Sequence, residues 1–121
     1  MDNTEYKYRI AVATTDGIVV NQHFGRADEF LIIGLDHQNQ IHRIEKRQVN
    51  PVCDGGEHDE KRLETTVNMF TDCKYVLVSR IGEGAAYALE KSGIIPIEFP
   101  GIIEESVQRI LVQELVLSIY L

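Results

Sequence analysis

The sequence predicts a single α/β domain in which one mixed five-stranded sheet carries helices on its faces. Three observations lead to this prediction. The early part of the chain contains apolar segments of strand length joined by short loops, and the periodicity becomes helical after about residue 57. Strands and helices then alternate, which is typical of a sheet covered by helices. A length of 121 residues is the usual size of one domain.

The first three predicted strands lie close together in the chain. Residues 8–14 are compact and partly β-branched and end at a turn signal, while residues 30–35 form a nearly continuous apolar run. Such a run is typical of a strand buried on both faces. Residues 41–49 are mainly polar and charged, which suits a strand at a sheet edge. The short connections favour antiparallel pairing of all three strands.

The second half of the chain adds helices. Leu63, Val67 and Phe70 recur at i, i+4 and i+7, which predicts an amphipathic helix over residues 57–72. Pro96 favours an edge position for the strand that contains it. The remaining predicted elements are a strand at 75–79, a helix at 83–92 that ends before Gly93, a strand at 94–98 and a helix from about residue 103.

The resulting order is β-β-β-α-β-α-β-α. In the ribonuclease-H-like arrangement such a chain has the spatial strand order 3-2-1-4-5, which puts the charged third strand and the Pro96 strand at the two edges. We expect one domain over residues 1–121, with residues 1–6 as an N-terminal tail.

Composition excludes several classes of function. A net charge of −7 argues against a nucleic-acid partner, since phosphate binding requires a basic face. The sequence has no run of about 20 apolar residues, so we expect no membrane association. Two cysteines are too few for a disulfide scaffold, and the start of the chain is polar and acidic. We therefore expect a cytoplasmic protein.

The predicted topology brings distant residues to one edge of the sheet. The segments after strands one, three, four and five leave the sheet on the same side, which we call the ligand rim, because open α/β sheets usually bind ligands there. Cys73 precedes the fourth strand and belongs to the opposite rim, where we expect it to be buried. The ligand rim contains His23, Arg26, Cys53, His58, Arg80 and two short glycine pairs.

Several of these residues have metal-binding chemistry. His23 precedes Gly25 in a long loop and offers a neutral ring nitrogen, although it could equally be a loop histidine bonded to backbone. Cys53 and His58 flank a glycine pair at a helix start, where the helix dipole favours a thiolate. Thiolate and imidazole together suit iron or zinc. The alternative is that these glycines form only a hinge.

A second glycine pair, Gly82 and Gly84, opens the second helix. Free backbone N–H groups there could face an anion, and Arg26 and Arg80 add positive charge to the same rim. The pair lacks the third glycine of a dinucleotide-binding fingerprint. Close packing between helix and strand is the alternative, and we favour it for these glycines.

The sequence resembles the dinitrogenase iron–molybdenum cofactor biosynthesis family, which comprises NifX- and NafY-type accessory proteins and the C-terminal domain of NifB. The resemblance covers about residues 6–109 and implies a ribonuclease-H-like fold that binds an iron–sulfur or iron–molybdenum cluster or its precursor. It also implies that His23 takes part in cofactor binding. It is carried by residues 7–13, His23-Phe24-Gly25-Arg26-Ala27, Arg80-Ile81-Gly82-Glu83-Gly84-Ala85 and Ser92-Gly93-Ile94-Ile95-Pro96.

We therefore expect a non-enzymatic carrier that docks an anionic cluster through His23, with Cys53 and His58 as further metal ligands, and exchanges it with a donor or acceptor protein. One alternative is a small enzyme with Cys53 as nucleophile and His23 or His58 as base. Another is an interaction module without a cofactor. The apolar residues of 112–121 exceed what one sheet face can cover, which predicts contact with a second subunit or another partner.

Overall fold

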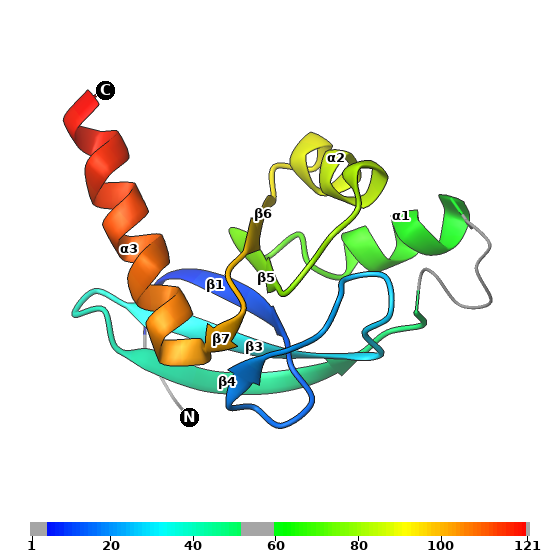
Figure 1. Cartoon of the computed structure of the whole chain (residues 1–121), viewed down its shortest axis with the longest axis horizontal. Coiled ribbons are helices and arrows are strands. Elements are labelled where there is room, and N and C mark those ends of the chain that lie inside the picture. Colours follow the sequence, from blue (N-terminus) through cyan, green and yellow to red (C-terminus); the bar gives the residue numbers. More distant parts are fainter. Residues whose placement is uncertain (1–4, 52–59, 121) are drawn as a thin grey trace.

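A computed structural model of the chain describes residues 5–51 and 60–120 (Figure 1). The predicted helices and strands are present, together with two additional two-residue strands. In chain order the elements are β1 (Tyr6–Ala13), β2 (Val19–Val20), β3 (Glu29–Asp36), β4 (Ile41–Gln48), α1 (Glu60–Asn68), β5 (Tyr75–Val78), α2 (Glu83–Lys91), β6 (Ile95–Glu98), β7 (Gly101–Ile102) and α3 (Ile103–Tyr120).

Five strands form the main sheet in the order β4-β3-β1-β5-β6. β1 lies at its centre, where Val12 pairs with Leu31 of antiparallel β3 and with Leu77 of parallel β5. β4 is antiparallel to β3, and β6 is parallel to β5. The predicted α/β class, with a mixed five-stranded sheet and three helices, is therefore confirmed.

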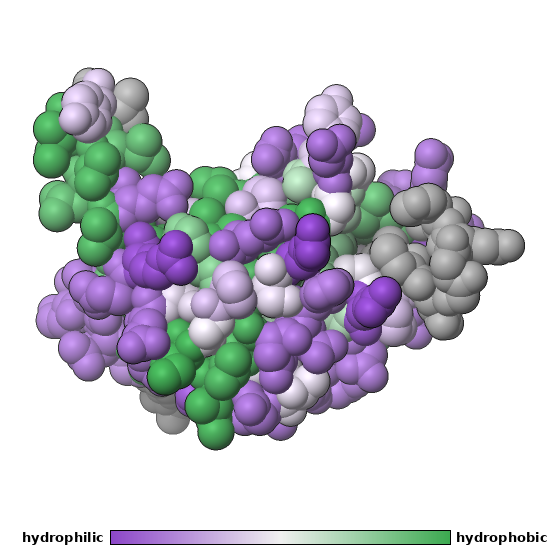
Figure 2. Space-filling model, viewed as in Figure 1, coloured by the Kyte–Doolittle hydropathy of each residue, from purple (hydrophilic) through white to green (hydrophobic). Residues whose placement is uncertain are grey.

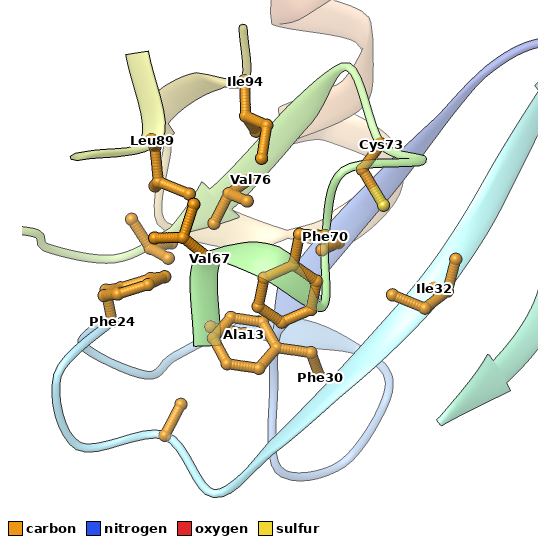
Figure 3. Close-up of a cluster of buried hydrophobic side chains, with 13 residues drawn as sticks. Ala13, Phe24, Phe30, Ile32, Val67, Phe70, Cys73, Val76, Leu89 and Ile94 are labelled. Carbon is orange, nitrogen blue, oxygen red and sulfur yellow. The ribbon is translucent and has the colours of Figure 1, made fainter. Parts of the chain in front are cut away.

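The core lies on both faces of this sheet, because successive side chains of a strand point to opposite faces. Ala11 and Ala13 of β1 belong to a cluster that also contains Phe70, beside α1, and Leu89 of α2 (Figure 3). Ile10 and Val12 belong to a second cluster, which α3 covers with Ile103, Val107 and Ile110.

β2 and β7 form a separate two-stranded antiparallel sheet, in which Val19 pairs with Ile102 and Val20 with Gly101. Neither segment lies within a strand predicted from the sequence. Pairs this short leave no alternation of side chains to detect. Because they join the loop after β1 to the start of α3, they fix the connection that leads into that helix.

The helix expected over residues 57–72 is shorter at its C-terminal end, and residues 57–59 lie outside the described residues. α1 ends at Asn68, and tight turns follow, in which Met69 N–H donates to Thr66 C=O (3.0 Å) and Phe70 N–H to Val67 C=O (3.0 Å). Arg47 of β4 explains this early end. Its guanidinium donates to the Met69 carbonyl (2.6 Å), an oxygen that a longer helix would use internally.

The N-terminal tail expected over residues 1–6 was placed too far along the chain, because Tyr6 is the first residue of β1. The ring of Tyr6 lies over Gly34, where an added Cβ would come within 2.6 Å of it. The centre of the same ring lies 5.5 Å from the centre of the His42 ring. A glycine in β3 therefore makes room for an aromatic ring, which fills the space that a side chain would occupy.

α3 is held on the sheet by Glu114, which joins three side chains from the ends of β1 and β5. Tyr8 donates to one carboxylate oxygen (2.9 Å), while Tyr75 and Lys74 (3.2 Å) donate to the other. Burial and the Glu114 carboxylate together raise the pKa of both tyrosines. Beyond Glu114 the helix projects away from the sheet (Figure 1). None of the described helices is long and apolar enough to cross a membrane.

Candidate functional site

The loop after β1 leaves the sheet and returns to it. Asn21 and Gln22 both donate their N–H groups to the carbonyl of Ala13 (3.2 and 3.3 Å), so the loop returns to the end of β1. The Asp16 carboxylate stabilises this loop by accepting hydrogen bonds from the N–H groups of Ile18 (2.8 Å) and Val19 (3.0 Å). Hydrogen bonds from the Val19 and Ile18 N–H groups lower the pKa of Asp16.

The returning segment then pairs with the end of β5. Ser79 N–H donates to Gln22 C=O (3.0 Å) and Phe24 N–H donates to Arg80 C=O (2.9 Å), which makes His23 and Arg80 a parallel β-bridge pair. The Phe24 side chain is buried, and its ring lies 5.9 Å from that of Phe30 (Figure 3). This packing anchors the loop in the core.

The carbonyl of His23 is also bonded, because it accepts the N–H groups of Arg26 and Ala27 (both 3.1 Å). Ala27 is buried, so the turn that follows His23 is fixed to the core. The backbone of His23 is thus held on both sides while its side chain is exposed. An imidazole in this position can meet a ligand without a rearrangement of the chain.

The opposite side of the site is the connection from β5 to α2. Ile81 N–H donates to a carboxylate oxygen of Glu98 (2.8 Å), which ties this connection to the end of β6. Gly82 is the N-cap of α2 in an extended conformation, and no side chain in the described part of the chain caps the helix. Its carbonyl accepts the N–H of Ala86 (3.0 Å). The other first-turn N–H groups have no intrahelical partner and point out of the helix end.

Close packing is not the reason for the glycines at this helix start. Among the residues that the structure describes, a Cβ built on Gly82 or on Gly84 would meet nothing within 4 Å, so both positions have room for a side chain. The packing interpretation favoured from the sequence was therefore wrong. What the two glycines do provide is open access to the backbone at the N-terminus of α2.

These segments enclose a surface pocket of about 300 Å³, which we call the rim pocket. It combines an exposed imidazole, two exposed guanidinium groups and the N-terminus of α2, so that a side chain able to ligate a metal and positively charged groups converge at one place. The pocket is lined by His23, Gly25, Arg26, Arg80, Ile81 and Gly82.

The rim pocket contains four of the predicted site residues. Gly84 lies in the first turn of α2 but not among the lining residues, and Cys53 and His58 lie outside the described residues. Among residues 5–51 and 60–120 no three His, Cys, Asp or Glu side chains group as a metal site would require. Among the side chains that line the rim pocket, the imidazole of His23 is the one of a type that can ligate a metal.

Sequence reasoning missed the contribution of Ile81 to the pocket and the role of Glu98 in holding Ile81. A signal was available for Glu98, which is the last residue of the strand before one of the predicted rim segments. Its pairing with Val78 of β5 places it beside the β5–α2 connection. Nothing in the sequence predicted that its carboxylate would accept a backbone N–H.

Cys73 lies at the opposite rim, at the start of β5, and is 5% exposed. Burial, together with the negative charge of Asp72, raises the pKa of its thiol to about 12. The prediction that Cys73 is buried is confirmed. Its separation from Cys53 cannot be judged from the described residues.

The fold and the rim pocket together define an α/β domain that presents an imidazole and two guanidinium groups beside a helix N-terminus. A comparison of the sequence with family models identifies the family. The chain belongs to the family described as dinitrogenase iron-molybdenum cofactor, whose model matches residues 6–113. The resemblance noted in the sequence is thus confirmed.

Individual relatives agree with this membership. The chain is 39% identical over 104 residues to the FeMo cofactor biosynthesis protein NifB of Frankia alni, and 35% identical over 103 residues to that of Chlorobaculum tepidum. The matches cover 84% and 85% of this chain but only 20% and 24% of those proteins. The chain therefore corresponds to about a fifth to a quarter of their length.

Solved structures support the fold. The apo form of the orange protein from Desulfovibrio gigas superimposes with a TM-score of 0.59 at 19% sequence identity, and the match covers 89% of both chains. At this identity the likeness concerns the fold alone.

Proposed function

We propose that this domain is a non-enzymatic carrier that binds an anionic iron–sulfur or iron–molybdenum cluster, or a precursor of one, in the rim pocket. The observation that carries the proposal is the β-bridge between His23 and Arg80, since it brings a metal-ligating imidazole and a guanidinium to one pocket. Membership of a family described by the iron–molybdenum cofactor of dinitrogenase supports this class of cargo.

Each group of the pocket has a role in this proposal. The exposed imidazole of His23 coordinates one iron or molybdenum atom at the surface of a preformed cluster. Arg26 and Arg80 neutralise the negative charge of the cluster, and the N–H groups at the start of α2 add partial positive charge. One protein ligand in an open pocket suits a cargo that must later pass to an acceptor protein.

The ribonuclease-H-like assignment belongs to the same proposal. The strand order β4-β3-β1-β5-β6, with β3 antiparallel to its neighbours, supports it. In this arrangement the segments after β1 and β5 leave the sheet side by side, which is why His23 and Arg80 can share a pocket. Cys53 and His58, which lie outside the described residues, remain further candidate ligands.

Anaerobic titration of the chain with isolated iron–molybdenum cofactor tests the proposal, with visible absorption and metal analysis as readouts. We expect about one cofactor per chain. The double change Arg26→Gln and Arg80→Gln should weaken binding at least tenfold, about 1.4 kcal/mol, and reduce its salt dependence. Arg43→Gln, which changes an exposed arginine of β4, is the matched control. A double variant that binds as tightly as the parent chain would refute the proposed role of the arginines.

A further inference from the structure

The outer face of α3 carries a pattern that the rim pocket does not use. Residues 105, 108, 109, 112, 115, 116 and 119 follow steps of three and four and therefore lie along one stripe of the helix. The buried residues of α3, Ile103, Ser106, Val107 and Ile110, occupy a different face. All seven residues of the stripe are exposed, and their spacing is that of a helix–helix seam.

The two halves of this stripe differ. The C-terminal half is apolar and exposed, with Val112 at 52%, Leu115 at 64%, Val116 at 45% and Ile119 at 72% exposure. Figure 2 shows this half as a hydrophobic projection at the end of the molecule. An exposed apolar surface of this kind, of the order of a few hundred Å², marks an interaction site.

The N-terminal half of the stripe lines a groove of about 590 Å³, together with Phe99. The surface of the groove is mainly apolar, and the guanidinium of Arg109 lies 4.1 Å from the centre of the Phe99 ring. Glu105 and Arg109 have opposite charges, so this half is close to neutral although the whole chain carries −7. The six lining residues are Phe99, Glu105, Gln108, Arg109, Val112 and Gln113.

We propose that this face binds a second copy of the chain, with the two α3 helices packed antiparallel about a two-fold axis near Val112. Ile119 lies seven residues after Val112 and Glu105 seven residues before it, roughly 10 Å in each direction at 1.5 Å per residue. An axis at Val112 therefore lays the apolar projection of each copy along the groove of the other. The contact between projection and groove therefore forms twice, once in each direction, as a two-fold interface requires.

The extent of the surface agrees with a second copy as the occupant. The projection alone is smaller than the roughly 800 Å² per partner of a standard interface. Adding the groove enlarges the buried surface, because both parts lie on the same stripe and one helix packed along it covers them together. Residues 115–120 carry no charged side chain, so this segment adds no like-charge pair to the contact between two acidic chains.

Sedimentation velocity of the parent chain across the micromolar range tests the proposal. We expect a concentration-dependent dimer, and Leu115→Glu should weaken it at least tenfold. Leu117→Glu is the matched control, because Leu117 is also exposed (51%) but lies off the stripe. Far-UV circular dichroism shows that each variant is folded. A parent chain that stays monomeric throughout, or a dimer that survives Leu115→Glu, would overturn the proposal.

Cross-linking tests the position of the axis. Under mild oxidation Val112→Cys should form an intermolecular disulfide, because only a residue at the axis meets its own copy. Leu117→Cys should not form this disulfide. The parent chain, which has only its own cysteines, is the control for background cross-linking. Equal cross-linking of both variants would contradict the antiparallel packing about Val112.

Discussion

His23 combines a fixed backbone with an exposed side chain. Its neighbour Phe24 is buried, its carbonyl accepts two N–H groups, and the segment pairs with the end of β5. Because its backbone is already fixed, His23 would lose little main-chain conformational entropy if its side chain bound a ligand. The backbone of the β5–α2 connection is held in the same way, because the carboxylate of Glu98 accepts the N–H of Ile81.

Cys73 offers a test at the scale of one residue. Its thiol is buried and its pKa is raised to about 12, so very little thiolate forms near neutral pH. In a Cys53→Ser variant, alkylation of Cys73 at pH 7.5 should be on the order of a hundredfold slower in the folded chain than in urea. Mass spectrometry of quenched samples measures both rates. Similar rates in the two conditions would contradict the burial of Cys73.

At this scale the sequence predicted His23, Arg26, Arg80 and Gly82 as neighbours, because the topology of the sheet sets which loops meet. It also predicted the burial of Cys73. It misjudged the glycines of α2, since room for a Cβ depends on the distance to neighbouring elements and not on spacing along the chain. The carboxylate of Glu98 was missed for the same reason.

Between elements, Arg47 joins β4 to the turn before β5. Two nitrogens of its guanidinium donate to the two carboxylate oxygens of Asp72 (2.9 and 2.7 Å), and one of them also donates to the Met69 carbonyl. The hydrogen bonds from Arg47 lower the pKa of Asp72 to about 2. A charged edge strand is thereby fastened to the segment that ends α1.

This pair should make stability depend on pH. The folded-state pKa of Asp72 lies below that of an unfolded aspartate, about 3.9, so its contribution is present above that value and is lost as pH falls toward 2. Because the Asp72 side chain is 45% exposed, we expect Asp72→Asn to lower the free energy of unfolding at pH 7 by only about 0.5–1 kcal/mol.

Urea unfolding at several pH values measures this difference between Asp72→Asn and the parent chain. The difference should shrink between pH 4 and pH 2. Asp28→Asn, at an exposed aspartate without a side-chain partner of this kind, should show at most a small effect. A difference for Asp72→Asn that stays constant down to pH 2 would show that the ion pair does not contribute.

Most helices and strands could be predicted because their hydrophobic patterns are strong, as in the continuous apolar run of β3. The end of α1 could not, since it is set by the distant Arg47. β2 and β7 escaped prediction because two-residue strands have no period, and their pairing joins segments about 80 positions apart. Tyr6 was assigned to a tail because its partner surface over Gly34 is formed only in the folded sheet.

For the whole molecule, the sheet separates two surfaces with different chemistry. The rim pocket lies where β1 and β5 end. The outer face of α3 begins beside β7 and projects past the opposite ends of β1 and β5, where Tyr8, Lys74 and Tyr75 hold Glu114. A domain arranged in this way can bind its cargo at one surface and a protein at another. Cargo binding and self-association should therefore be separable by substitution.

The central claim is that His23 ligates a metal cluster in the rim pocket. The most direct measurement is the affinity of the His23→Ala variant for isolated iron–molybdenum cofactor, determined anaerobically beside the parent chain. His37→Ala is the matched control, since His37 is exposed in the turn between β3 and β4 and distant from the pocket. We predict a loss of at least tenfold, about 1.4 kcal/mol, for His23→Ala alone, with unchanged far-UV circular dichroism. Equal affinity of His23→Ala and the parent chain would contradict the claim.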